Sequence, residues 1–166
     1  TAPSRVYNRQ NTTSEHTRNL GIKGGQSNGI VDDMGIDGQG FVRVDTEWGL
    51  NRIAGNKCTV FYPSNSAITN NEHVGLFYHP QSNTVWVHSK DGRADIFNCK
   101  TQTFSHFEVD GKTVWSIADI CMAADSTIWL ADYNGGVHHY TPLTKENEFI
   151  DAKQIRQIAN GVRSIT

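Results

Sequence analysis

Short apolar runs alternate with polar positions along most of this chain, and clusters of turn-forming residues separate the runs. Over residues 72–108 the runs read EHVGLFYH, TVWVHS, RADIFN and QTFSHFE. The breaks between them fall at Pro80 to Asn83, Lys90 to Gly92 and Cys99 to Thr101. Alternation with a period of two is typical of half-buried strands, and clusters of Gly, Pro and Asn indicate turns. The pattern therefore predicts four antiparallel strands rather than helices in this segment.

The same arrangement recurs with a period of 43 residues. Laying STIWLADYNGGVHHYTP on NTVWVHSKDGRADIFN aligns Trp129 with Trp86 and Gly135 with Gly92. An earlier copy, GFVRVDTEWGLNRI, has Arg43 at the tryptophan position. The flanking apolar positions keep the same step, as in Val31, Val74 and Ile117, and in Met34, Phe77 and Ile120. Three units in phase indicate a repeat architecture.

A period of about 40 to 50 residues with four strands per unit is typical of a β-propeller, whose blades surround a channel. We expect an all-β fold with three blades at about 28–69, 70–112 and 113–150. We also expect a ring-closing strand within the N-terminal segment 1–27 and the start of a further blade at 151–166. Three whole units fall short of the roughly 4 to 8 blades of known propellers. The propeller is therefore expected to be incomplete, and more chain or a partner should cover its open ends.

Composition narrows the class of protein. The chain has a net charge of −2 and a pI near 6.3, so it offers no basic face for nucleic acid. It contains no apolar run long enough to span a bilayer, and its start, TAPSRVYNRQ, lacks the apolar stretch of a signal peptide. On this observation alone the chain is mature, trimmed or cytosolic. The three cysteines show no CxxC spacing and predict neither a disulfide framework nor a zinc site.

The sequence predicts no catalytic residues, no metal site and no cofactor. His138 and His139 are adjacent, as are Asp32 and Asp33, and neighbours in a strand point to opposite faces. Neither pair can therefore act together on one metal ion or one substrate. We expect His138 and His139 to form one surface and one core side chain, and we expect this chain not to be an enzyme.

Two tryptophans and one arginine share the same position in the repeat. Trp86 and Trp129 are expected to fill the space between neighbouring blades. Arg43 stands at this position in the first unit, where a buried cation needs a carboxylate partner. The neighbouring carboxylates that we expect to supply it are Asp32, Asp33 and Asp45.

These units resemble the two-component regulator propeller repeat, which has the form D-x-x-G, x-I-W-V-x-T and x-x-G-G-L-x-R/Y. The resemblance covers about Leu20 to Thr166, and GIVDDMGIDGQGFVRVDTEWGLNRI and VWSIADICMAADSTIWLADYNGGVHHYTP are its most specific segments. The chain departs from the repeat at Arg43, which replaces the usual Trp, and at Pro80 to Asn83, where a turn glycine is expected.

The resemblance implies the periplasmic sensor region of a bacterial hybrid two-component system. The parent protein would be anchored in the inner membrane and would carry a histidine kinase, often with a response regulator. Members of this family detect glycan fragments, so the implied ligand is an oligosaccharide. The implied protein partners are the remaining blades of the same parent chain. Whether a second copy also binds to form a homodimer is left open. Two alternatives also stay open: part of a propeller-fold enzyme, such as a lyase or glycan-active hydrolase, and a protein-interaction scaffold.

Topology predicts where such a ligand would bind. In a propeller, the turns between second and third strands share one face with the segments that precede first strands, and exposed loops there can bind ligand. Trp48 and Tyr133 could stack on a sugar ring, while Asp91 and Asn134 could form hydrogen bonds with hydroxyl groups. The complete set of candidate ligand-binding residues is Trp48, Glu47, Asp91, Tyr133, Asn134 and Trp115.

Overall fold

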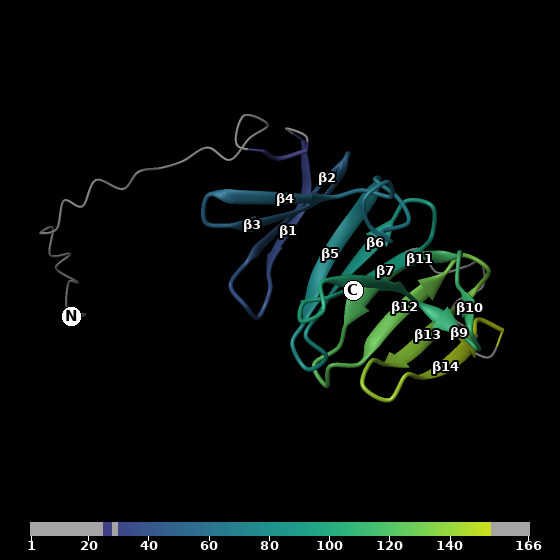
Figure 1. Ribbon diagram of the computed structural model, residues 1–166. Coiled ribbons are helices and arrows are strands. Elements are labelled where there is room, and N and C mark those ends of the chain that lie inside the picture. The colour runs from purple at the N-terminus through teal and green to yellow at the C-terminus, as the bar shows by residue number, and fades with distance from the viewer. Residues whose placement is uncertain (1–24, 28–29, 154–166) are drawn as a thin grey trace, which may run out of the picture.

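The computed structural model describes residues 25–27 and 30–153 and contains three four-stranded antiparallel sheets, each in the order of its sequence (Figure 1). The first sheet, blade 1, consists of β1 (Val31–Ile36), β2 (Val42–Thr46), β3 (Gly49–Ala54) and β4 (Lys57–Phe61). The second, blade 2, consists of β5 (His73–His79), β6 (Thr84–Ser89), β7 (Ala94–Asn98) and β8 (Thr103–His106). The third, blade 3, consists of β11 (Ile117–Met122), β12 (Ile128–Asp132), β13 (Gly136–Thr141) and β14 (Glu146–Asp151).

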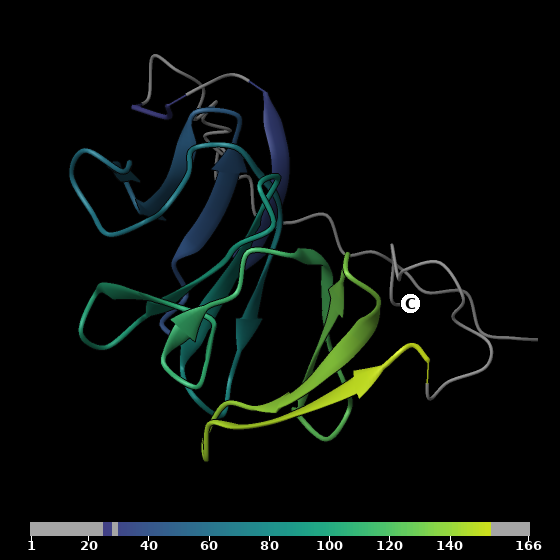
Figure 2. The ribbon, with the colours of Figure 1, turned by 90° about the vertical axis from the view of Figure 1, so that its right-hand side faces the viewer.

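The sheets follow one another as blades in an open arc, and this confirms the predicted β-propeller fold. Figure 2 shows blade 1 in purple and blue, blade 2 in teal and blade 3 in green and yellow. A two-stranded hairpin, β9 (Glu108–Val109) and β10 (Lys112–Thr113), joins blade 2 to blade 3. Within the described ranges, no helix is long and apolar enough to cross a membrane.

The period of 43 residues reappears in the backbone conformation. Gly40, Asn83 and Ser126 occupy equivalent positions before the second strand of each blade, with φ values of 80°, 52° and 66°. Asparagine tolerates this left-handed region better than most residues. Asn83 therefore supplies the conformation for which the repeat normally uses glycine, and the unusual turn at Pro80 to Asn83 leaves the blade intact.

Large side chains fill the junction between blades 2 and 3, as predicted for Trp86. This residue is 1% exposed and packs on the blade 3 residues Ile128 and Leu130. Its ring stacks on Phe77 with centroids 6.2 Å apart and meets Tyr140 edge-on at 5.7 Å. Burying an aromatic ring of this size contributes a large share of the contact between two blades.

Trp129 points from β12 to the other face of blade 3, because neighbouring residues in a strand alternate between faces. Its ring stacks on His139 with centroids 4.3 Å apart, and this face points away from blade 2. No further blade lies within the described residues, so the inter-blade position of Trp129 stays a prediction.

A buried salt bridge within blade 1 takes the place of the tryptophan at the junction with blade 2. Arg43 is 1% exposed, and its Nε and Nη2 atoms donate to Asp37 Oδ2 at 3.0 and 2.8 Å. The guanidinium also lies over the ring of Phe97, 4.3 Å from its centroid. The prediction of a buried ion pair is thus confirmed, but the predicted partners were wrong. The turn before β2 folds back and brings Asp37, six residues before Arg43, onto the blade face beside the guanidinium.

The three carboxylates that we had predicted for Arg43 belong to β1 and β2, and two of them link blade 1 to blade 2. Asp45 Oδ1 lies 2.6 Å from Nδ1 of His73. Asp33 Oδ2 accepts a hydrogen bond from the backbone N–H of Leu76 at 2.9 Å. Asp32 is the residue at the β-bulge that interrupts the pairing of β1 with β2.

Most of the two predicted terminal elements lies outside the described residues. The ring-closing strand within 1–27 is described only at 25–27, where Ser27 N donates to Asn51 Oδ1 at 2.9 Å. The further blade at 151–166 is described only to residue 153. The predicted blade limits of 28–69, 70–112 and 113–150 also stay predictions, since the strands of each sheet cover only part of each range.

Candidate functional site

The predicted ligand-binding turns gather at one edge of the blades, which we call the turn edge. It consists of the turns after β2, β6 and β12 and of the segments before β5 and β11. Backbone hydrogen bonds tie these turns to the segments at the start of first strands: within blade 2, Lys90 N donates to Glu72 O at 3.0 Å, and between blades 3 and 2, Ile117 N donates to Gly92 O at 2.9 Å. Because the second bond crosses between blades, a ligand at this part of the turn edge would contact blades 2 and 3.

Arg93 brings two of the predicted residues together. Its guanidinium lies 4.1 Å from the centroid of the Trp115 ring and forms an ion pair with Asp91. Partial burial alone would raise the pKa of Asp91, but the hydrogen bonds and positive charge of Arg93 outweigh this effect and lower that pKa. The turn thus holds an ionised carboxylate, a cation and an aromatic ring side by side. Sequence analysis missed Arg93, although its position two residues after Asp91 was a usable signal.

Tyr133 and Asn134 lie in the turn between β12 and β13. Tyr133 N donates to Ser116 O at 2.7 Å, which places this turn beside the segment that precedes β11. Asn134 N donates to Asp132 Oδ1 at 2.7 Å, and Ser116 Oγ donates to the other oxygen of the same carboxylate at 2.7 Å. Asp132 therefore orders the turn, and the side chain of Tyr133 is free to face solvent.

Trp48 and Glu47 lie in the corresponding turn of blade 1. The backbone N–H of Trp48 donates to Thr46 Oγ1 at 3.3 Å. No stacking between aromatic rings joins Trp48 to Trp115 or Tyr133 in the part of the chain that the structure describes. The three rings are 64%, 61% and 58% exposed, respectively. They are separate aromatic surfaces along the turn edge rather than one cage.

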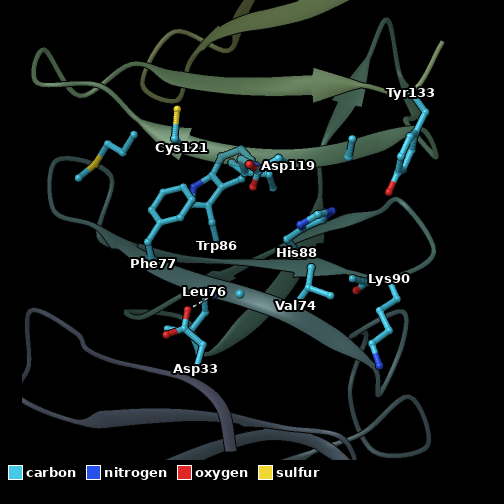
Figure 3. Close-up of a pocket in the computed structure, with 15 residues that line it drawn as sticks. Asp33, Val74, Leu76, Phe77, Trp86, His88, Lys90, Asp119, Cys121 and Tyr133 are labelled. Atoms are coloured by element: carbon cyan, nitrogen blue, oxygen red, sulfur yellow. Dashed lines mark hydrogen bonds between the residues drawn. The ribbon is translucent and has the colours of Figure 1, made fainter. Parts of the chain in front are cut away.

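A cavity between blades 2 and 3 is the second candidate site, and sequence analysis did not predict it. It has a volume of about 630 Å³ and opens between β5 and β11. Figure 3 shows Val74 on one wall and Asp119 and Cys121 on the other, with Trp86 and Phe77 at one end. Tyr133 and Lys90 also line this cavity, so it reaches the turn edge.

His88 is the buried titratable group of this cavity. Its Nε2 atom lies 3.1 Å from the carbonyl oxygen of Ile117, and a carbonyl only accepts, so Nε2 carries the proton. Burial lowers the pKa of His88, and the hydrogen bond to Ile117 opposes this only in part. The imidazole is therefore neutral near pH 7, and its Nδ1 atom is a hydrogen-bond acceptor.

No group of three or more His, Cys, Asp or Glu side chains with metal-binding geometry occurs in the described ranges. His138 is buried and His139 lies on the opposite face, as predicted. The cysteines at 58, 99 and 121 are free thiols, and burial raises the pKa of each.

Comparisons with known proteins support the fold. No family model matches the chain, and no curated protein matches it. Among solved structures, the extracellular domain of BT3049 from B. thetaiotaomicron, assigned as a hybrid two-component system, is 22% identical with a TM-score of 0.73 over 87% of this chain. The extracellular domain of BT4673 from the same organism, assigned as a one-component system, is 16% identical with a TM-score of 0.60 over 83% of this chain.

This chain spans about one fifth of each of those two proteins, 21% and 19% respectively. The propeller fold that the repeat predicts is therefore similar in three dimensions to these two extracellular domains. The chain has a β-propeller fold, and it shares this fold with the extracellular domains of B. thetaiotaomicron signalling proteins.

Proposed function

We propose that this chain forms blades of a ligand-sensing propeller on the periplasmic or extracellular side of a bacterial inner membrane, in a two-component system. The observation that carries this proposal is the fold shared with extracellular domains of proteins assigned to such systems. Further blades would complete the propeller, and a membrane-anchored parent with a histidine kinase would transmit the signal. These blades would bind without catalysing.

The proposed ligand is an oligosaccharide bound at the turn edge. The aromatic surfaces of Trp48, Trp115 and Tyr133 are more than half exposed, and such rings stack on the C–H faces of sugars while polar neighbours bind the hydroxyl groups. The pairing of Arg93 with Asp91 beside Trp115 supplies donors and acceptors next to one ring. These properties favour a neutral, hydroxylated ligand over a polyanion, in agreement with the net charge of −2.

Isothermal titration tests this proposal. We would titrate the protein that carries these blades with a panel of linear pentose and hexose oligosaccharides, and compare the wild type with Trp48→Ala and Trp115→Ala. Loss of one stacking ring should weaken binding by about 1 kcal/mol, which corresponds to roughly a fivefold higher Kd. Leu143→Ala, in the turn between β13 and β14, is the matched control because Leu143 is equally exposed but lies away from the turn edge.

The outcomes separate the open interpretations. Saturable binding that both tryptophan variants weaken supports a glycan sensor with its site at the turn edge. Saturable binding that neither variant changes would move the site away from these turns. If no oligosaccharide binds, the glycan proposal is wrong and protein interaction becomes the better account.

A further inference from the structure

The two junctions between blades differ, and a single position in the repeat explains the difference. At the first junction, Asp33 Oδ2 accepts the backbone N–H of Leu76, and β1 packs directly against β5. Asp33 pairs with Asp45 on β2, and the residue that pairs with the equivalent His88 on β6 is Gly75. Glycine has no side chain, so the second junction has no carboxylate at this position to accept a backbone N–H of β11. The link cannot repeat, and the cavity opens at the place where it is missing (Figure 3).

The walls of the cavity combine apolar surfaces with polar groups. Phe77 and Trp86, stacked with an angle of 4° between their planes, form a flat apolar end. Val74 and Met122 extend the apolar surface along both walls. A ligand that fits must therefore have apolar faces as well as polar edges.

Two buried polar atoms beside the cavity have no hydrogen-bond partner among the described residues. They are Nε1 of Trp86 and Oγ of Ser89, in side chains 1% and 0% exposed. Buried polar atoms without a partner are uncommon in folded proteins, so a bound molecule that offers them hydrogen bonds would be favoured here. His88 Nδ1 adds an acceptor, and the ammonium group of Lys90 adds a donor near the turn edge. Hydroxyl groups satisfy such a mixture because each can both donate and accept.

We propose that the cavity between β5 and β11 binds one saccharide ring, as the innermost subsite of the oligosaccharide that reaches it from the turn edge. The volume of about 630 Å³ lies within the range of about 300 to 1,000 Å³ typical of small-molecule sites. Tyr133 and Lys90 line both the cavity and its opening, which makes the two sites continuous. This proposal rests on the proposed function, since it names where one ring of that ligand binds.

Two variants that fill the cavity from opposite walls test the proposal. Val74→Trp adds an indole on β5 and Met122→Trp adds one on β11; both native side chains are exposed, so a larger residue is tolerated there without repacking the core. Each variant should raise the Kd for the best oligosaccharide of the panel at least about tenfold, because a blocked subsite loses a whole ring's contacts. Leu143→Trp is the matched control and should leave the Kd unchanged. Circular dichroism and the urea midpoint verify that all three variants fold.

The results distinguish this proposal from the previous one. If Trp48→Ala or Trp115→Ala weakens binding while both filled-cavity variants bind as the wild type does, the turn-edge proposal stands and the cavity subsite is overturned. If the filled-cavity variants weaken binding and the control does not, the subsite is supported. If the wild type binds no saccharide of the panel, both proposals are overturned together.

Discussion

The buried pair of Arg43 and Asp37 offers a sharp test of how blades 1 and 2 hold together. Asp37→Asn preserves the shape of the side chain and its oxygen, which accepts the backbone N–H groups of Gln39 and Phe41 at 3.0 and 3.1 Å. It removes the charge that faces Nε and Nη2 of Arg43. The amide group would then present its own donors to the guanidinium.

The magnitude follows from burial. Arg43 is 1% exposed, and its Nη1 atom already has no hydrogen-bond partner within the described residues. Breaking a buried ion pair by removing one partner costs about 3 to 5 kcal/mol, because the other charge stays buried and unpaired. We therefore expect Asp37→Asn to lower the free energy of unfolding by about 3 to 5 kcal/mol.

A second substitution separates charge from packing. Adding Arg43→Met to Asp37→Asn removes the unpaired cation and leaves an unbranched side chain to pack on Phe97. The double variant should recover about 2 kcal/mol or more relative to Asp37→Asn alone. Urea denaturation, with the midpoint and slope recorded for each variant, measures these differences in the free energy of unfolding. Asp125→Asn is the control, since Asp125 accepts Thr127 N in an exposed turn.

Two results would refute the reasoning. If Asp37→Asn shifts the free energy of unfolding by less than about 1 kcal/mol, the pair is not the main support of this junction. If the added Arg43→Met lowers stability further, the arginine contributes through packing rather than through its charge.

Two further predictions concern the blade turns and pH. Gly92 has φ 83°, and a Cβ added there would lie 2.5 Å from the Trp115 carbonyl oxygen. Gly111 has φ 72°, but nothing lies within 4 Å of a Cβ added there. Thermal denaturation should therefore show Gly92→Ala to be markedly less stable than the control Gly111→Ala. Gly111→Ala should lower the free energy of unfolding only by the strain of a left-handed alanine, about 1 to 2 kcal/mol. Equal melting temperatures of the two variants would contradict the predicted clash. Because burial lowers the folded-state pKa of His88, the unfolded chain takes up the proton first, and stability present above about pH 6.5 is lost as the pH falls below it. Between about pH 7.5 and about pH 5.5, the urea midpoint should therefore fall further for the wild type than for His88→Gln. An equal fall of the midpoint in both proteins would exclude His88 as a source of the pH dependence.

The repeat explains why so much of the fold could be predicted. Apolar and polar positions alternate with a period of two in each strand, turns need Gly or Asn, and the whole unit recurs after 43 residues. Residues such as Trp86 and Gly92 therefore already indicate a blade from their place in this pattern. The turn-edge residues followed from topology in the same way. Their role as a ligand site stays a prediction.

The partners across blade junctions depend on tertiary structure. The sequence by itself determined that these residues form consecutive four-stranded blades, because each blade's strands lie close along the chain. Only the packing of one blade on the next decided that Asp45 meets His73, that Asp33 binds the backbone of Leu76, and that a cavity opens at the following junction. Contacts of this kind depend on distances between side chains far apart in sequence, and periodicity carries no information about those distances.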